Sequence, residues 1–156
     1  MNAAPNFSSL LDEAPTTVES PKVLPAGTYH CVVRGSPRYD KSSKKQTPFV
    51  EFTLIPQSAL EDVDESDLSA WATKASGDVR KLTDAAIKAT YYETEDAIFM
   101  LDQFHEHCGI DLSVPMSRRN RNEEVQNSEV LVVLRHEASD DGQRIFARLA
   151  RTASVV

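Results

Sequence analysis

Residues 94–109 read Thr-Glu-Asp-Ala-Ile-Phe-Met-Leu-Asp-Gln-Phe-His-Glu-His-Cys-Gly, and they form the clearest element of the sequence. Thr94 is a typical helix N-cap, and the two acids after it suit a first helical turn because they interact favourably with the helix dipole. Gly109 is typical of the residue that follows a helix. The stretch therefore predicts a helix whose apolar residues recur at helical spacing: Ala97, Ile98, Leu101, Phe104 and Cys108.

Five stretches with the composition of β-strands flank this helix, three before it and two after it. They lie at residues 28–34, 48–54, about 86–93, 129–136 and 143–150. In the second stretch, Val50, Phe52 and Leu54 share one face, with Phe49, Glu51 and Thr53 on the other. The last two are joined by residues 138–142, which contain an Asp-Gly turn signal, so we expect a hairpin.

The connecting segments are polar. Residues 35–47 predict a long basic loop, residues 57–76 an exposed helix with Leu68 and Trp71 as inward contacts, and residues 110–128 an irregular segment. Residues 1–23 are rich in proline and poor in apolar residues, which predicts a flexible arm.

The element order is that of an OB-fold, a partly open Greek-key barrel. We expect a mainly β fold with α: a five-stranded OB-like barrel with a helix between strands 3 and 4. A helical insertion, residues 57–85, would lie between strands 2 and 3 of a single domain spanning residues 24–156. Another small α+β fold, or a sandwich with the same element order, is the alternative.

The net charge of −7 over 156 residues argues at first against a nucleic-acid partner. The charge is unevenly distributed, however. Residues 22–54 carry six bases and two acids, hence +4, whereas residues 55–67 carry five acids and no base. A local basic surface is therefore compatible with the acidic total.

Other classes of protein receive no support from the sequence. No apolar run approaches the ~20 residues of a membrane helix, and the N-terminus lacks the basic and apolar regions of a signal peptide. Two cysteines cannot form a disulfide framework. We therefore expect a cytoplasmic protein, in the host cytoplasm if it is phage-encoded.

In an OB-fold, the loops between strands 1 and 2 and between strands 4 and 5 flank the ligand face. Basic residues there would contact phosphates and aromatic residues would stack on bases. Tyr39 is the aromatic residue that we expect to be most exposed, because it lies in a polar segment. The candidate nucleic-acid-binding residues are Arg34, Arg38, Tyr39, Lys41, Lys44, Lys45, Phe49, Arg118, Arg119, Arg121 and Arg144.

Two further stretches carry a resemblance to known proteins. Leu24-Pro-Ala-Gly-Thr-Tyr through Lys44-Lys-Gln-Thr-Pro-Phe-Val-Glu-Phe-Thr-Leu, and Tyr92-Glu-Thr-Glu-Asp-Ala-Ile-Phe-Met-Leu followed by Gly109-Ile-Asp, resemble a group of small bacteriophage proteins. That group is similar to single-stranded DNA-binding proteins with OB-like folds. The resemblance covers roughly residues 24–112, and it implies a role in DNA replication or recombination.

Other sites are less well supported. His105 and Cys108 share a helix face, but a zinc site needs about four ligands and no second pair is present. Asp62, Asp64 and Asp67 are spaced somewhat like the ligands of a calcium loop, but their segment lacks the glycine that such a loop needs. No catalytic or phosphate-binding motif occurs, so we expect no enzyme activity, no metal and no cofactor.

The sequence thus predicts a non-catalytic, largely sequence-independent single-stranded DNA-binding protein. It could also act with phage or host replication or recombination proteins, and it could form a homo-oligomer. The alternative is a protein-interaction module that binds a phage or host protein through the acidic insertion and the N-terminal arm.

Overall fold

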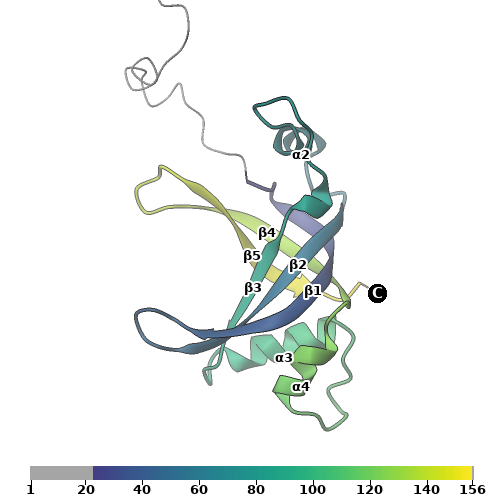
Figure 1. Cartoon of the computed structure of the whole chain (residues 1–156), viewed down its shortest axis with the longest axis vertical. Helices are drawn as coiled ribbons and strands as arrows, with labels where there is room; N and C mark the ends of the chain where they lie inside the picture. The colour runs from purple at the N-terminus through teal and green to yellow at the C-terminus, as the bar shows by residue number, and fades with distance from the viewer. Residues whose placement is uncertain (1–22, 156) are drawn as a thin grey trace, which may run out of the picture.

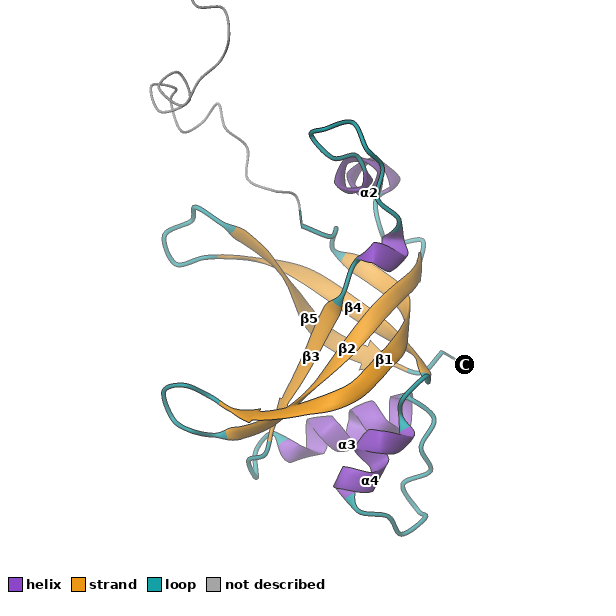
Figure 2. Cartoon of the chain, in the orientation of Figure 1, coloured by secondary structure: helices purple, strands orange, loops and turns teal. Residues whose placement is uncertain are grey.

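The computed structural model describes residues 23–155, so nearly all of the expected arm, residues 1–23, lies outside the described residues. The described chain is mainly β, with a five-stranded antiparallel sheet in the order β3-β2-β1-β4-β5 (Figures 1 and 2). The strands are β1 (Gly27–Lys41), β2 (Pro48–Ala59), β3 (Ile87–Tyr92), β4 (Glu129–Ala138) and β5 (Ile145–Ala153). All five expected strands are present, and β4 and β5 form the expected hairpin.

The sheet curves around a core formed by alternate residues of its strands. Val50, Phe52 and Leu54 are buried on one face of β2, which confirms the expected alternation. The helix α3 (Ile98–His107) closes this core with Leu101 and Phe104. The Phe104 ring centroid lies 4.7 Å from that of Phe52. Burial of these apolar side chains is the main stabilising term of the fold.

The first hairpin differs from the prediction. Residues 35–47 were expected to form a loop, but β1 continues to Lys41 and only residues 42–47 form the turn. An irregularity between Arg34 and Arg38 interrupts the pairing, which then resumes with Arg38 opposite Glu51. The loop prediction was wrong because it relied on polar composition, whereas an exposed strand is held by backbone hydrogen bonds to its partner.

The segment between β2 and β3 also differs in its boundaries. The predicted helix over residues 57–76 is wrong at both ends, since β2 extends to Ala59 and α2 covers only Glu65–Ala72. The Asp64 side chain caps α2 by accepting a hydrogen bond from the Asp67 backbone N–H at 2.9 Å. Trp71 is buried and Leu68 packs against the core, as predicted.

The acidic part of this segment packs on the start of β1. Asp62 accepts hydrogen bonds from the Thr28 backbone N–H at 2.9 Å and hydroxyl at 2.7 Å. These bonds hold the pKa of Asp62 below its usual value. Gly27 has a φ of +134°, and a Cβ at this position would lie 2.6 Å from Cγ2 of Val63. A glycine is therefore required where the segment crosses β1.

The region around α3 shows two further corrections. α3 begins at Ile98 rather than directly after Thr94, whose hydroxyl instead accepts a hydrogen bond from the Ala97 N–H in the preceding turn. Residues 110–128 were predicted to be irregular, but Arg118–Glu124 form α4, capped by the side chain of Ser117. Within residues 23–155, no helix has the length and apolar character needed to cross a membrane.

Candidate nucleic-acid interface

The side chains of β1, β2 and β3 that point away from the core form a second surface, which we call the outer face. The strand register sets these residues opposite one another in three rows across the sheet. The rows are Arg34–Thr53–Lys88, Arg38–Glu51–Thr90 and Asp40–Phe49–Tyr92. The outer face therefore combines cations, two carboxylates, hydroxyl groups and two aromatic rings on three adjacent strands.

Phe49 and Tyr92 form an aromatic pair at one end of the outer face. Their ring centroids are 5.7 Å apart in an edge-to-face arrangement. Phe49 is half-buried, whereas Tyr92 has 42% of its surface exposed. The Arg38 guanidinium carbon lies 5.3 Å from the Phe49 ring centroid, so a cation covers this side of the pair.

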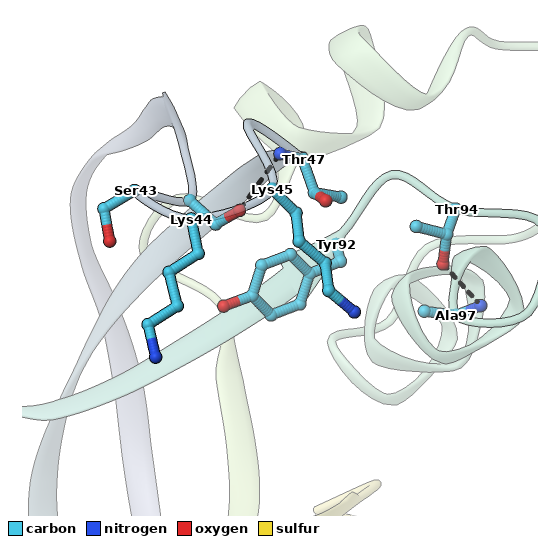
Figure 3. A pocket seen from close by; sticks show the side chains of 8 residues that line it. Ser43, Lys44, Lys45, Thr47, Tyr92, Thr94 and Ala97 are labelled. Carbon is cyan, nitrogen blue, oxygen red and sulfur yellow. Dashed lines mark hydrogen bonds between the residues drawn. The ribbon is translucent and has the colours of Figure 1, made fainter.

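The turn between β1 and β2 brings two lysines to the same aromatic ring. Lys44, Lys45 and Tyr92 line a cavity of about 520 Å³ together with Thr94 and Ala97 at the approach to α3 (Figure 3). In Figure 3, both lysine side chains leave the turn on the side where the Tyr92 ring lies, and their amino groups extend past the ring. The turn is closed by a hydrogen bond from the Ser42 N–H to the Thr47 carbonyl at 2.9 Å.

The basic residues of this hairpin differ in their electrostatic partners. Arg38 is paired with Asp40 at 2.7 Å and with Glu51 at 3.2 Å. The pKa of Asp40 is lowered by the Lys41 backbone N–H and by Arg38. We define the lysine turn as Lys41, the last residue of β1, together with Lys44 and Lys45 in the turn that follows. In residues 23–155, by contrast, no ion pair involves Arg34 or these three lysines.

Tyr39 does not belong to the outer face, and the expectation that it is exposed is wrong. Because β1 continues through this position, alternation directs Tyr39 away from Arg38 and Asp40. Its hydroxyl accepts a hydrogen bond from Nδ2 of Asn122 at 3.0 Å. The Arg119 guanidinium carbon lies 4.6 Å from its ring centroid.

Asn122 extends this contact into the core. Its Oδ1 lies 2.7 Å from Nε2 of His105, and both residues are buried. His105 is therefore a core histidine rather than an exposed residue at the end of the helix, and burial lowers its pKa. Cys108 is also buried, and burial raises its pKa to about 12. No group of side chains in residues 23–155 has the composition of a metal site.

The arginines of α4 are used within the protein. Arg118 donates to both carboxylate oxygens of Asp102, at 2.8 and 3.0 Å. Arg121 donates to the carbonyls of Leu112 and Val114. Together with Arg119, these residues lie on α4 beside α3 and not on the outer face (Figure 1). The structure therefore does not bring them together with the lysine turn.

Arg144 lies elsewhere, at the β4–β5 turn, where it is exposed. Its backbone N–H donates to the hydroxyl of Ser139 at 3.1 Å. The β1–β2 and β4–β5 hairpins project to the same side of the sheet (Figure 1). The structure thus groups the predicted residues Arg34, Arg38, Lys41, Lys44, Lys45 and Phe49 on the first hairpin and leaves Arg144 on the second.

Sequence reasoning missed two members of the outer face, Tyr92 and Lys88. The signal that could have identified them is the alternation of β3, in which Ile87, Ala89 and Tyr91 are buried while the residues between them are exposed. The aromatic residue that faces solvent beside the lysines is therefore Tyr92, not Tyr39.

No protein-family model and no curated protein matches the chain. The site is therefore interpreted from its geometry.

Proposed function

We propose that this chain binds single-stranded DNA non-catalytically, through the outer face of an OB-like barrel. The sheet order, with β1 paired to both β2 and β4 and with α3 between β3 and β4 in the chain, supports an OB-like topology. In OB-folds the face of strands 2 and 3 binds oligonucleotides. The outer face here includes those same two strands.

The observation that carries the proposal is the exposed ring of Tyr92, paired with the half-buried Phe49, beside the lysine turn. Base stacking on an aromatic ring tolerates any sequence, because every base has a π face. Lysines that have no carboxylate partner can neutralise phosphates and release counterions. The combination fits a flexible strand whose bases lie on Tyr92 and whose phosphates face Lys44 and Lys45.

The net charge of −7 is compatible with DNA binding at the outer face. Glu51 and Asp40, the two carboxylates of the outer-face rows, are both paired with Arg38. The acidic residue Asp62 is bonded to Thr28 at the start of β1, at the other end of that strand from the lysine turn. Arg38 therefore offsets part of the charge of the two outer-face carboxylates, and Asp62 is held away from the lysine turn.

The test is a fluorescence anisotropy titration of labelled oligo-dT with the wild-type chain and with variants of Tyr92. Tyr92→Ala is expected to weaken binding by about 1–3 kcal/mol, because one stacking platform is lost. Tyr92→Phe, which retains the ring, should bind like the wild type. Tyr92→Leu retains apolar surface without a π face, so it should behave like the alanine variant.

Affinity should also fall steeply as salt is raised, because phosphate contacts release counterions. Absence of binding at low salt would overturn the proposal. Equal affinities for Tyr92→Ala and wild type would also contradict it, since strand binding would then not use the outer face.

A further inference from the structure

A separate cavity of about 300 Å³ lies where α3, β3 and β5 meet. It is lined by Lys88 of β3, by Gln103 and His107 of α3, and by Arg148 and Arg151 of β5. Thr90 and Thr152 add hydroxyl groups to its wall. The cavity therefore offers three cationic side chains together with neutral hydrogen-bonding groups.

None of the residues that line this cavity is acidic, although the chain as a whole has a net charge of −7. No ion pair joins Lys88, Arg148 or Arg151 to a carboxylate within the part of the chain that the structure describes. The Lys88 ammonium donates to the neutral hydroxyl of Thr53 at 2.7 Å, so this hydrogen bond is to an uncharged group. Elsewhere, Arg38 and Arg118 each have a carboxylate partner.

A β-bulge explains how β5 supplies two arginines to one cavity. Arg148 and Arg151 are three residues apart, so on a regular strand they would point to opposite faces. The register shifts between Val133 and Leu134, whose partners on β5 are Arg151 and Leu149. The extra residue, Ala150, reverses the alternation, so that both arginines line the same cavity.

Helix α3 fixes the opposite wall of the cavity. Nδ1 of His107 lies 2.7 Å from the hydroxyl oxygen of Thr152, which joins α3 to β5. The Arg148 guanidinium carbon lies 4.9 Å from the ring centroid of Phe146, so this side chain is held by an aromatic ring and not by a counter-ion. The cations therefore lie around a cavity whose walls are held together.

We infer that this cavity binds a phosphate group. The guanidinium of arginine presents donors that match the oxygens of a phosphate in a bidentate geometry. Lys88 adds a point charge, and the side-chain amide of Gln103 adds a neutral donor. This inference goes beyond the proposed function, because a phosphate site can be occupied without any nucleic acid on the outer face.

The phosphate could belong to the end of a DNA strand, to its interior or to a free nucleotide. Lys88 and Thr90 belong both to this cavity and to the outer face, so a strand bound there would pass close to it. The chemistry that recognises the three sources is the same, and the experiment separates them.

The primary test is calorimetric titration of the wild-type chain with inorganic phosphate at fixed ionic strength. Saturable binding with a dissociation constant near or below about 1 mM is expected. Arg151→Ala should weaken it roughly tenfold or more, since a charge-assisted contact is lost. Lys74→Ala is the control for the loss of one positive charge, because Lys74 is exposed between α2 and β3 and does not line the cavity.

Three further titrants identify the source: thymidine monophosphate, and oligo-dT with and without a 5′-phosphate. Tighter binding of the phosphorylated oligonucleotide, lost in Arg151→Ala, assigns the site to a strand end. If both oligonucleotides bind with equal affinity and Arg151→Ala weakens both equally, the site binds an internal phosphate of the strand. If Arg151→Ala weakens only the binding of the mononucleotide, the site binds free nucleotides.

No saturable phosphate binding by the wild-type chain, or equal phosphate binding by wild type and Arg151→Ala, would overturn this inference. Both outcomes are measured without DNA, so they leave the role of Tyr92 in strand binding to its own test. Circular dichroism of each variant establishes that the fold is retained.

Discussion

The lysine turn and α4 each contain three basic residues in a short segment, but the structure uses these residues differently. Lys41, Lys44 and Lys45 are exposed at the end of a hairpin and have no ion pair within residues 23–155. The arginines of α4 contact Asp102, Tyr39 and the carbonyls of Leu112 and Val114. Basic composition alone therefore does not indicate which segment can bind a partner.

The difference follows from what surrounds each segment. The turn at residues 42–47 is held by its own backbone hydrogen bonds, so its lysine side chains extend into solvent. α4 packs between α3 and β1, where the planar guanidinium of arginine can bridge carboxylates, carbonyls and aromatic rings. We therefore expect changes on α4 to alter stability, and changes in the lysine turn to alter binding.

The largest expected effect is on α4, at Asn122. Asn122→Ala removes the partner of Nε2 of His105 and the donor to the Tyr39 hydroxyl. Leaving a buried polar group without a partner costs roughly 1–3 kcal/mol, so the free energy of unfolding should fall by about that amount. Urea unfolding measures it. Asn120→Ala is the matched control on the exposed side of the same helix and should change stability far less.

If Asn122→Ala instead had the stability of the wild type while losing oligo-dT affinity, the contrast between the two segments would be wrong, and α4 would belong to the binding surface.

The second effect concerns the lysine turn. The double variant Lys44→Ala, Lys45→Ala should keep the stability of the wild type within about 0.5 kcal/mol, because both side chains are exposed. Its affinity for oligo-dT should fall about tenfold at low salt, and the slope of log K against log salt should decrease in magnitude by about 1.4.

Lys74→Ala, Lys81→Ala removes the same charge from two exposed lysines between α2 and β3, and it serves as the control. An equal loss of affinity in both double variants would show that total charge, and not the position of the lysines, governs binding.

The smallest expected effect is the pH dependence of α4 packing. Burial lowers the pKa of His105 from its usual 6.5, while its contact with Asn122 and the charge of Asp102 act in the opposite direction. Below pH 6.5, His105 becomes protonated in the unfolded chain, whereas burial disfavours its protonation in the folded chain. Stability should therefore be complete above that pH and should decrease as the pH falls, by at most about 1.4 kcal/mol per pH unit.

Urea unfolding between pH 7.5 and 5.5 checks this, with His105→Gln as a variant that cannot titrate. The neighbouring Asp102 has its pKa lowered by hydrogen bonds from Arg118, so it titrates below this window. An identical pH dependence in wild type and His105→Gln would rule out His105 as the responsible group.

Much of the first hairpin could be predicted from its residues. The alternation of residues 49–54 separated Val50, Phe52 and Leu54 from the residues between them, and the structure shows that this first set is the buried one. Lys44 and Lys45 were expected in a loop between two strands, and they lie in the shorter turn that joins β1 and β2. These features depend on period-two alternation and on turn composition, which are local properties.

Tyr39 and Arg121 could not be assigned in the same way. Tyr39 was expected to be exposed because its segment is polar, and Arg121 was a candidate for nucleic-acid binding because it belongs to a basic stretch. The first depends on β1 continuing past Arg34, and the second on α4 packing beside α3. Both are decided by contacts between segments far apart in the chain.

The sequence by itself determined the order of the five strands and the helix α3, the division of β2 into two faces and the presence of basic residues between the first two strands, because each of these follows from the spacing and composition of residues along one segment. Only the tertiary structure decided that Tyr92 lies beside the lysines, that α4 uses its arginines internally, and that a bulge at Ala150 brings Arg148 and Arg151 to one cavity. These features require strand register and helix packing, which place residues from distant segments side by side.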